Sequence, residues 1–177
     1  MMSLGGALKT VLSQMAPPEG TTFIPPSCYG LMTLQTGEIR LKVMLPASPE
    51  IVYDMLMDPV KHAQFTNAPA SGSSEVGGAF IAIDGYVRSR NIELEKGKRI
   101  VQEWSTTEWP DNLPPSRLEI MLRPIGQGTD LFMMQTGVPE ADIEKYAQSW
   151  YDLCWDPLFE FLREISTRRQ VRPDTKG

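Results

Sequence analysis

Apolar and polar residues alternate most regularly over residues 38–45. Four alternate positions of this stretch are apolar, namely Ile39, Leu41, Val43 and Leu45. A period of two with one apolar face is typical of an antiparallel strand that is buried on one side, and Pro46 ends this one. The same alternation recurs at residues 117–123, and a run rich in Leu, Phe and Met follows at residues 130–136.

The stretch 76–109 predicts three further consecutive strands. Runs at residues 80–83 and 88–94 flank Asp84-Gly85. Asp-Gly between two such runs predicts a two-residue type I′ hairpin turn, because both central positions of that turn need a positive φ. Gly97 separates the second run from a third at residues 100–104. The chain therefore contains about six predicted strands, and their turn-length connections favour an antiparallel sheet.

Two short helices are predicted directly after the first strand. Ser48 and Pro49 have the residue types preferred at the N-cap and at the first helical position, and Asp58 and Pro59 repeat this signal. His62 lies on the second of these helices. No cysteine or carboxylate cluster adjoins His62 in the sequence, so we interpret it as a structural or solvent-exposed residue.

A long C-terminal helix is predicted over residues 143–165, where apolar residues recur every three or four positions. Pro157 falls inside the pattern and predicts a kink or break near residues 154–156. So wide an apolar stripe needs a large partner surface, and the concave face of the sheet is the candidate. The sequence thus predicts an α+β fold in which a curved antiparallel sheet wraps around a long helix, with a cavity between the two.

Composition and charge narrow the classes of partner and compartment. The 177 residues carry 17 basic and 22 acidic side chains, which argues against nucleic acid as the main partner. The two cysteines, Cys28 and Cys154, fit a reducing compartment, and a single histidine excludes a histidine-rich metal site. No membrane-spanning run and no secretory signal are recognised. We expect a cytoplasmic protein with no cofactor, in which residues 38–167 form one domain between an extension, 1–37, and a charged tail, 168–177.

Several motifs, in this order, resemble one family. They are Phe65–Ala70 (FTNAPA), Gly77–Phe80 (GGAF), Asp84-Gly85, Trp104, Trp109-Pro110 and Trp150. Together they resemble the C-terminal domain of the activators of heat shock protein 90 ATPase, within the START-like or helix-grip superfamily. The resemblance covers about residues 38–165, and residues 1–37 do not match the family's N-terminal domain, which carries its principal chaperone-binding motif. It implies the helix-grip fold and a co-chaperone of the stress response whose partner is heat shock protein 90.

Two candidate sites follow from the pattern, and each has an alternative. A ligand pocket between sheet and helix would use Phe80, Trp104, Trp109, Met133, Trp150 and Cys154, although these residues also suit plain core packing. A protein-binding patch would use Arg88, Arg90, Lys96, Lys98 and Arg99, although these also suit a solvated charged face. The carboxylates considered as catalytic acids are Asp84, Glu93, Glu103 and Glu108. Since no nucleophile or phosphate-binding motif is present, binding without chemistry is favoured over catalysis, with carriage of a small hydrophobic ligand as the alternative.

Overall fold

A computed structural model describes residues 35–171 of the chain. Most of the predicted extension, including Cys28, and residues 172–177 of the predicted tail lie outside the described residues. Within the described part, β1 begins at Thr36, and the last helix continues to Val171, past the predicted end of the domain at Thr167.

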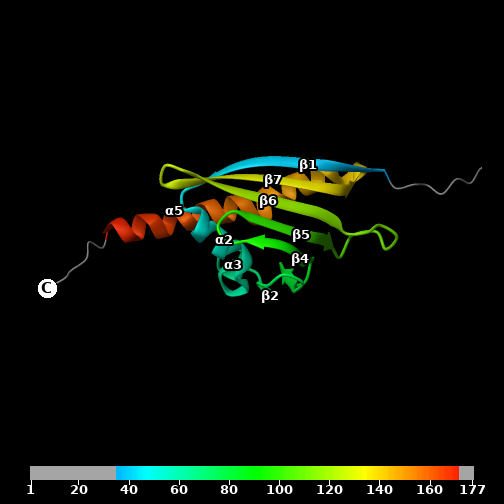
Figure 1. Ribbon diagram of the computed structural model, residues 1–177, viewed down its shortest axis with the longest axis horizontal. Coiled ribbons are helices and arrows are strands. Elements are labelled where there is room, and N and C mark those ends of the chain that lie inside the picture. Colours follow the sequence, from blue (N-terminus) through cyan, green and yellow to red (C-terminus); the bar gives the residue numbers. More distant parts are fainter. Residues whose placement is uncertain (1–34, 172–177) are drawn as a thin grey trace, which may run out of the picture. The chain divides into compact units, whose positions relative to one another are not determined.

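Seven strands form one antiparallel sheet in the order β1-β7-β6-β5-β4-β3-β2 (Figure 1). Their bounds are β1 Thr36–Leu45, β2 Ser71–Gly72, β3 Ala79–Ala82, β4 Val87–Glu95, β5 Arg99–Thr106, β6 Ser116–Ile125 and β7 Gly128–Pro139. The antiparallel sheet and its six predicted strands are confirmed. The seventh, β2, has two residues inside a predicted loop, because so short a pairing leaves no pattern in the sequence.

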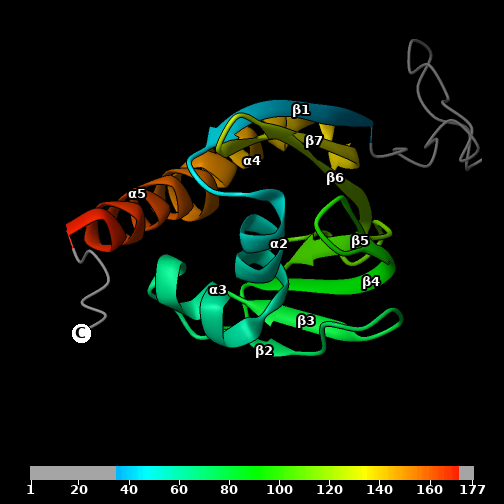
Figure 2. The ribbon, with the colours of Figure 1, turned by 60° about the vertical axis from the view of Figure 1, so that its left-hand side comes forward.

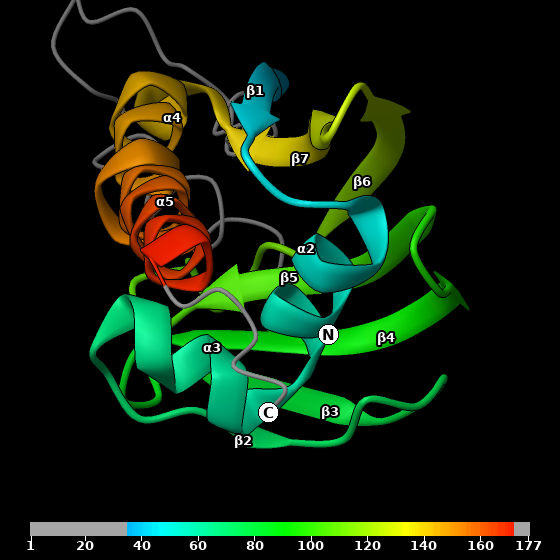
Figure 3. The same cartoon turned by 90° about the vertical axis from the view of Figure 1, so that its left-hand side faces the viewer.

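The helices gather on the concave side of this sheet. Figures 2 and 3 show α4 and α5 running along that side, with α3 between α5 and the strands β3 and β2. The helix α2 packs against β6 and β7. The helical elements are α2 Pro49–Met57, α3 Pro59–Thr66, the 3-10 turn Glu140–Asp142, α4 Ile143–Trp150, the π-helical turn Tyr151–Trp155 and α5 Asp156–Val171. The predicted α+β helix-grip architecture is therefore confirmed, with two short helices after the first strand and a long C-terminal helix.

The alternation along the strands decides which side chains enter the core. Ile39 and Leu45 on β1 are buried, whereas Arg40 and Met44 between them are exposed on the opposite face. The helix contributes fully buried side chains to the same core, among them Trp155, Leu158 and Leu162. Burying an apolar side chain of this size contributes about 1.5–3 kcal/mol, so the seam between sheet and helix is the main source of stability.

The hairpin between β3 and β4 differs from its prediction. A four-residue loop, Ile83–Tyr86, replaces the two-residue turn, since Ala82 pairs with Val87. Asp84 and Gly85 have positive φ as the turn chemistry requires, but Ile83 also has a φ of 52°, which is unusual for a β-branched residue. The Asp84 N–H donates to the Pro69 carbonyl over 3.0 Å, so the loop is held against the segment before β2.

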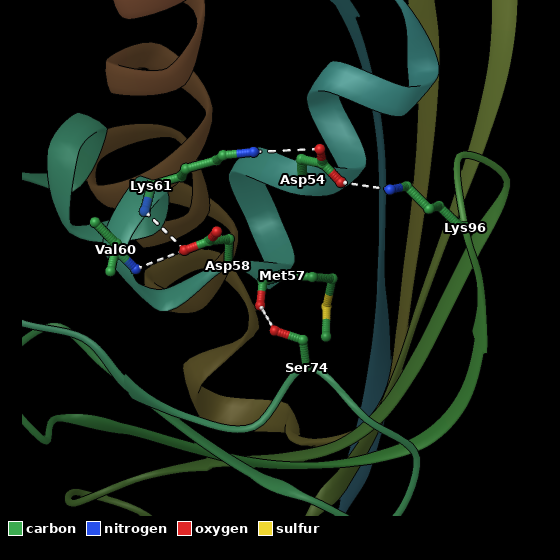
Figure 4. Close-up of polar contacts among 7 residues, drawn as sticks. All are labelled: Asp54, Met57, Asp58, Val60, Lys61, Ser74 and Lys96. Atoms are coloured by element: carbon green, nitrogen blue, oxygen red, sulfur yellow. Dashed lines mark hydrogen bonds and ion pairs between the residues drawn. The ribbon is translucent and has the colours of Figure 1, made fainter.

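The junction of α2 and α3 is fixed by polar contacts (Figure 4). The Asp58 carboxylate accepts from the backbone N–H groups of Val60 and Lys61 at 2.9 and 3.2 Å, as an N-cap does. The Ser74 hydroxyl donates to the Met57 carbonyl over 2.7 Å and ties the end of α2 to the loop after β2. The end of α2 and the start of α3 are therefore held beside the loop after β2, while the rest of α2 packs against β6 and β7.

The irregularity predicted at Pro157 takes the form of a π-helical turn at Tyr151–Trp155. Proline lacks an N–H, and its ring collides with the carbonyl one turn earlier, so the helix before it must widen, break or bend. Here the widened turn keeps the helix continuous. It also sets Trp155 and Leu158 on the buried side, both with no exposed surface.

Candidate functional site

A cavity of about 80 Å³ lies between the concave face of the sheet and the helix. Ile100, Gln102 and Trp104 of β5 form its floor, and Trp150 and Leu153 lie on the helical side. Pockets for small molecules usually enclose about 300–1,000 Å³. This cavity is smaller, so it suits a small molecule or the end of a longer one.

Four of the six residues predicted for a ligand pocket line this cavity, namely Phe80, Trp104, Trp150 and Cys154. Trp109 and Met133 are buried but do not line it. The indole N–H of Trp109 donates to the Pro114 carbonyl over 3.1 Å, which holds the ring in the β5–β6 loop. Met133 is 2% exposed and belongs to the apolar core.

The aromatic residues form one connected wall. Trp104 meets Trp109 and Tyr146 edge to face, with ring centroids 6.1 and 6.0 Å apart. Trp150 lies 5.4 Å from Trp104 and stacks on Trp155 at 5.3 Å. All four centroid separations lie in the range favoured for aromatic pairs, so each ring supports the orientation of its neighbours.

A buried chain of hydrogen bonds fixes Trp150 in this wall. Its indole N–H donates to Gln135 Oε1 over 2.8 Å, and Gln135 Nε2 donates to the Ser116 hydroxyl over 2.8 Å. Ser116 in turn donates to the Trp104 carbonyl over 2.8 Å. The chain links helix, β7, β6 and β5, so the position of Trp150 is set by hydrogen bonds as well as by packing. The sequence signal for it was a glutamine in phase with the inward-facing Leu131 and Met133.

His62 also lines the cavity, which the sequence interpretation did not foresee. Its ring packs 4.8 Å from Phe65 and 5.4 Å from Phe80, measured between centroids. Burial lowers the pKa of His62 below its usual value, and a hydrogen bond to the Leu56 carbonyl opposes this more weakly. The imidazole is therefore neutral at pH 7. His62 carried no recognisable signal because its cavity neighbours, such as Phe80 and Gln102, are distant in the sequence.

Cys154 faces the cavity as a thiol. Burial raises its pKa far above the usual range for cysteine, because an apolar environment disfavours the thiolate. The thiolate is the nucleophilic form of cysteine, so Cys154 acts here as a small apolar side chain.

An ion-pair cluster joins three elements beside the cavity. Tyr86, which lines the cavity, donates to Glu108 over 3.0 Å, and the Lys145 ammonium lies 2.6 Å from the same oxygen. The hydrogen bond from Lys145 and the one from Tyr86 lower the pKa of Glu108. Glu108 is therefore an ionised acceptor that connects the hairpin, the β5–β6 loop and α4.

The other three carboxylates considered as catalytic acids lie away from the cavity. Asp84 is in the β3–β4 loop, and Glu93 forms an ion pair with Arg99 at 2.5 Å. Glu103 is exposed on β5, on the face opposite Trp104. The cavity is thus lined by neutral groups. Among the described residues, no cluster of three or more His, Cys, Asp or Glu side chains is arranged to hold a metal ion.

Three of the five residues predicted for a basic patch are paired with carboxylates of this chain. Lys96 contacts Asp54 at 3.5 Å, as Figure 4 shows, and Lys98 contacts Glu95 at 2.6 Å. Arg99 lies between two carboxylates, since Glu119 accepts from its Nε at 2.8 Å. Arg88 and Arg90 are exposed on β4 and form no ion pair with the rest of residues 35–171.

Comparison with known proteins finds a matching family model and several curated relatives. Residues 46–163 match the family model described as "Activator of Hsp90 ATPase homolog 1-like protein". The human activator of 90 kDa heat shock protein ATPase homolog 1 is 30% identical over 144 residues, which cover 81% of this chain and 41% of that protein. The Dictyostelium discoideum homologue is 29% identical over 116 residues, covering 65% of this chain and 30% of that protein. The chain thus spans less than half the length of these curated relatives.

Solved structures show the same fold. A crystal structure described as an HSP90 activator from Plasmodium falciparum superimposes with a TM-score of 0.62 at 16% identity, covering 75% of this chain and 96% of that one. The solution structure of the Aha1 dimer from Colwellia psychrerythraea gives 0.61 at 16% identity, covering 71% and 95%. No helix in the described part of the chain is long and apolar enough to cross a membrane.

Proposed function

Because this chain belongs to the family of activators of Hsp90 ATPase, we propose that it is a co-chaperone-like domain that binds heat shock protein 90 in the cytoplasm and performs no chemistry of its own. The observation that carries the proposal is the match of the family model over residues 46–163, most of the described fold. The cavity lining carries no charged side chain, and Cys154 is held as the thiol and not as the nucleophilic thiolate, which supports binding over catalysis.

Binding stimulates ATP turnover only if the chain prefers one conformation of the chaperone. A ligand shifts a conformational equilibrium by its difference in affinity for the two states. A tenfold shift towards the closed, ATP-competent arrangement needs a difference of about 1.4 kcal/mol in binding free energy. A few contacts made only with the closed state supply that amount, so a domain of this size is sufficient.

The exposed arginines of β4 are the proposed contact surface. Arg88 and Arg90 point away from the cavity, because Ser89 between them lines it. Arg88 pairs across the sheet with Ile81, which is 37% exposed, so basic and apolar groups lie side by side. Such a surface suits an acidic partner segment that also carries apolar side chains.

The experiment is a titration of the purified chain into heat shock protein 90, following ATP turnover. We expect turnover to rise with a half-maximal concentration of tens of micromolar or less, about the range of transient interfaces. Arg88→Glu combined with Arg90→Glu should raise that concentration about tenfold or more through charge repulsion. Arg163→Glu reverses one exposed arginine on α5, which pairs with Glu160 of the same helix, and serves as the control for a charge change away from β4. The proposal is overturned if the native chain neither binds heat shock protein 90 nor changes its ATP turnover.

A second candidate function rests on the cavity itself. A hollow lined by Phe80, Trp104 and Trp150, with Leu153 39% exposed beside them, suits a small apolar ligand. Toluene is a suitable probe, and nuclear magnetic resonance titration should show the indole N–H signals of Trp104 and Trp150 moving together. If toluene leaves both signals unchanged up to its solubility limit, the cavity is not a binding site for apolar molecules.

A further inference from the structure

The polar groups of the cavity are mainly hydrogen-bond acceptors, because hydrogen bonds to other parts of the chain use up most of the donors. The clearest case starts at Asn91, a fully buried residue at the bulge of β4. Its Nδ2 donates to two backbone carbonyls, those of Ser73 and Glu75, both at 2.9 Å. Carbonyl oxygens only accept, so the amide group of Asn91 must point its N–H atoms at them and its oxygen the other way.

The orientation of Asn91 determines that of Gln102. Asn91 Oδ1 is an acceptor, and Gln102 Nε2 lies 2.7 Å from it. Gln102 must therefore present its own N–H atoms to Asn91, which leaves Oε1 on the other branch of the amide. Gln102 lines the cavity, and its Oε1 accepts no hydrogen bond from residues 35–171.

His62 is oriented by the same logic. Its Nδ1 lies 3.2 Å from the Leu56 carbonyl, which only accepts, so Nδ1 carries the proton. In the neutral ring Nε2 then has a free lone pair, and it receives no hydrogen bond from the described part of the chain. Burial lowers the pKa of His62, which keeps the ring in this neutral form at pH 7. His62 thus provides a second acceptor in the same cavity.

Three hydroxyl groups of the lining donate their hydrogens within the chain, and a fourth, that of Tyr146, shares a hydrogen bond with the Thr106 hydroxyl over 3.3 Å. Ser89 donates to the Phe80 carbonyl over 3.2 Å, and Ser149 donates to the Lys145 carbonyl over 2.9 Å. Tyr86 donates to Glu108 over 3.0 Å. Trp104 retains an indole N–H that donates to no group within residues 35–171. The cavity therefore has an excess of acceptors within a mainly apolar lining.

We propose that the cavity selects small, neutral, mainly apolar molecules that carry a hydroxyl group, which donates to His62 Nε2 or Gln102 Oε1. The proposal rests on the apolar-ligand function given above and specifies its ligand class. An ether oxygen can accept a hydrogen bond but cannot donate one, so the hydroxyl hydrogen distinguishes the two classes of ligand. A carboxylate is disfavoured, because the lone pairs of both acceptors repel it and the apolar lining removes its hydration.

Size limits the class further. A cavity of about 150 Å³ takes up benzene in an engineered protein. The cavity here has about 80 Å³, so a single ring enters only if a side chain at its margin moves. Leu153 is the candidate, since it lines the cavity, is 39% exposed and lies in the π-helical turn. Compounds of one ring with one small substituent are therefore the upper limit without larger rearrangement.

The test compares four probes of similar size on the whole chain: phenol, anisole, toluene and benzoate. Affinities come from nuclear magnetic resonance titrations at pH 7, followed on the indole signals of Trp104 and Trp150. We expect phenol to bind about three- to tenfold more tightly than anisole, the range of one net hydrogen bond, and benzoate not to bind. His62→Phe and Gln102→Met should each lower the phenol-to-anisole ratio and leave toluene affinity within about twofold.

Met133→Leu is the matched control, because Met133 is buried in the core but does not line the cavity. Equal binding of phenol, anisole and toluene by the native chain overturns the hydroxyl preference and leaves the apolar-ligand function standing. No binding of any probe overturns both. A phenol preference that survives both His62→Phe and Gln102→Met overturns the assignment of the two acceptors, and the native comparison holds even if one variant fails to fold.

Discussion

Single polar side chains inside apolar surroundings decide the properties of this site. Gln135 is fully buried between apolar neighbours on β7, yet both ends of its amide are hydrogen-bonded. Removing one partner of a buried hydrogen bond costs more than the bond contributes, because the other partner remains desolvated. Substitutions of Gln135 and His62 should therefore have clear effects on stability and on its pH dependence.

Gln135→Leu should destabilise the fold by about 1–3 kcal/mol, since it leaves the Trp150 N–H without its acceptor and Ser116 without its donor. Urea unfolding followed by circular dichroism measures this loss. Gln148→Leu is the control, because Gln148 is exposed and bonds only Asp152 on the same helical face. A loss for Gln135→Leu no larger than that of the control would show that the buried chain of hydrogen bonds contributes nothing to stability.

His62 should make stability depend on pH. Its folded pKa is lowered by burial, so between that value and the usual one of about 6.5 the unfolded chain binds more protons than the folded chain. Stability is then fully present above pH 6.5 and is lost as the pH falls below it. Thermal unfolding at pH 7 and pH 5 should show a larger decrease for the native chain than for His62→Phe. An equal decrease in both would mean that His62 titrates normally.

The residues predicted for the pocket show what the sequence can and cannot specify. Trp104, Trp150 and Cys154 lie on elements whose facing sides follow from periodicity, and they line the cavity. Trp109 follows β5 in a loop, where no period fixes the direction of a side chain. Gln102 shares the inward face of β5 with Ile100 and Trp104, so its place in the cavity follows from the period of two, whereas the orientation of its amide depends on Asn91 of the neighbouring strand. His62 reaches the cavity because α3 packs beside β3, a tertiary contact that the local sequence does not record.

At the scale of elements, periodicity and end signals predicted most of the fold. The strands, the proline-started helices α2 and α3 and the long helix all follow from local pattern. The differences lie where tertiary contacts override it. The β3–β4 loop adopts positive φ at Ile83 while Pro69 anchors Asp84, and the response to Pro157 is a π turn that keeps Leu158 buried.

The seam between α5 and the sheet gives a prediction at this scale. Leu162 has no exposed surface, whereas Phe159 on the same helix is 38% exposed. Leu162→Ala should destabilise the fold by about 2–5 kcal/mol through lost burial and a new cavity. Phe159→Ala should cost less than about 1 kcal/mol, as is usual for surface substitutions. Urea midpoints for the two variants compare them directly, and similar losses would contradict the described packing of α5.

At the scale of the whole molecule, the chain corresponds to part of its curated relatives, which are longer. It covers 41% of the human homologue and 30% of the Dictyostelium one. The proposed binding of heat shock protein 90 is therefore a property of this domain by itself. Its surface offers two exposed arginines on β4, while the other predicted basic residues are engaged within the chain.

Calorimetric titration of this chain into heat shock protein 90, with a non-hydrolysable ATP analogue present, measures the proposed binding itself. We expect saturable binding with a Kd of about 10–50 μM or tighter, weakened by Arg88→Glu with Arg90→Glu and unchanged by Arg163→Glu. The absence of saturable heat at chain concentrations up to about 200 μM, several times that Kd, would contradict it.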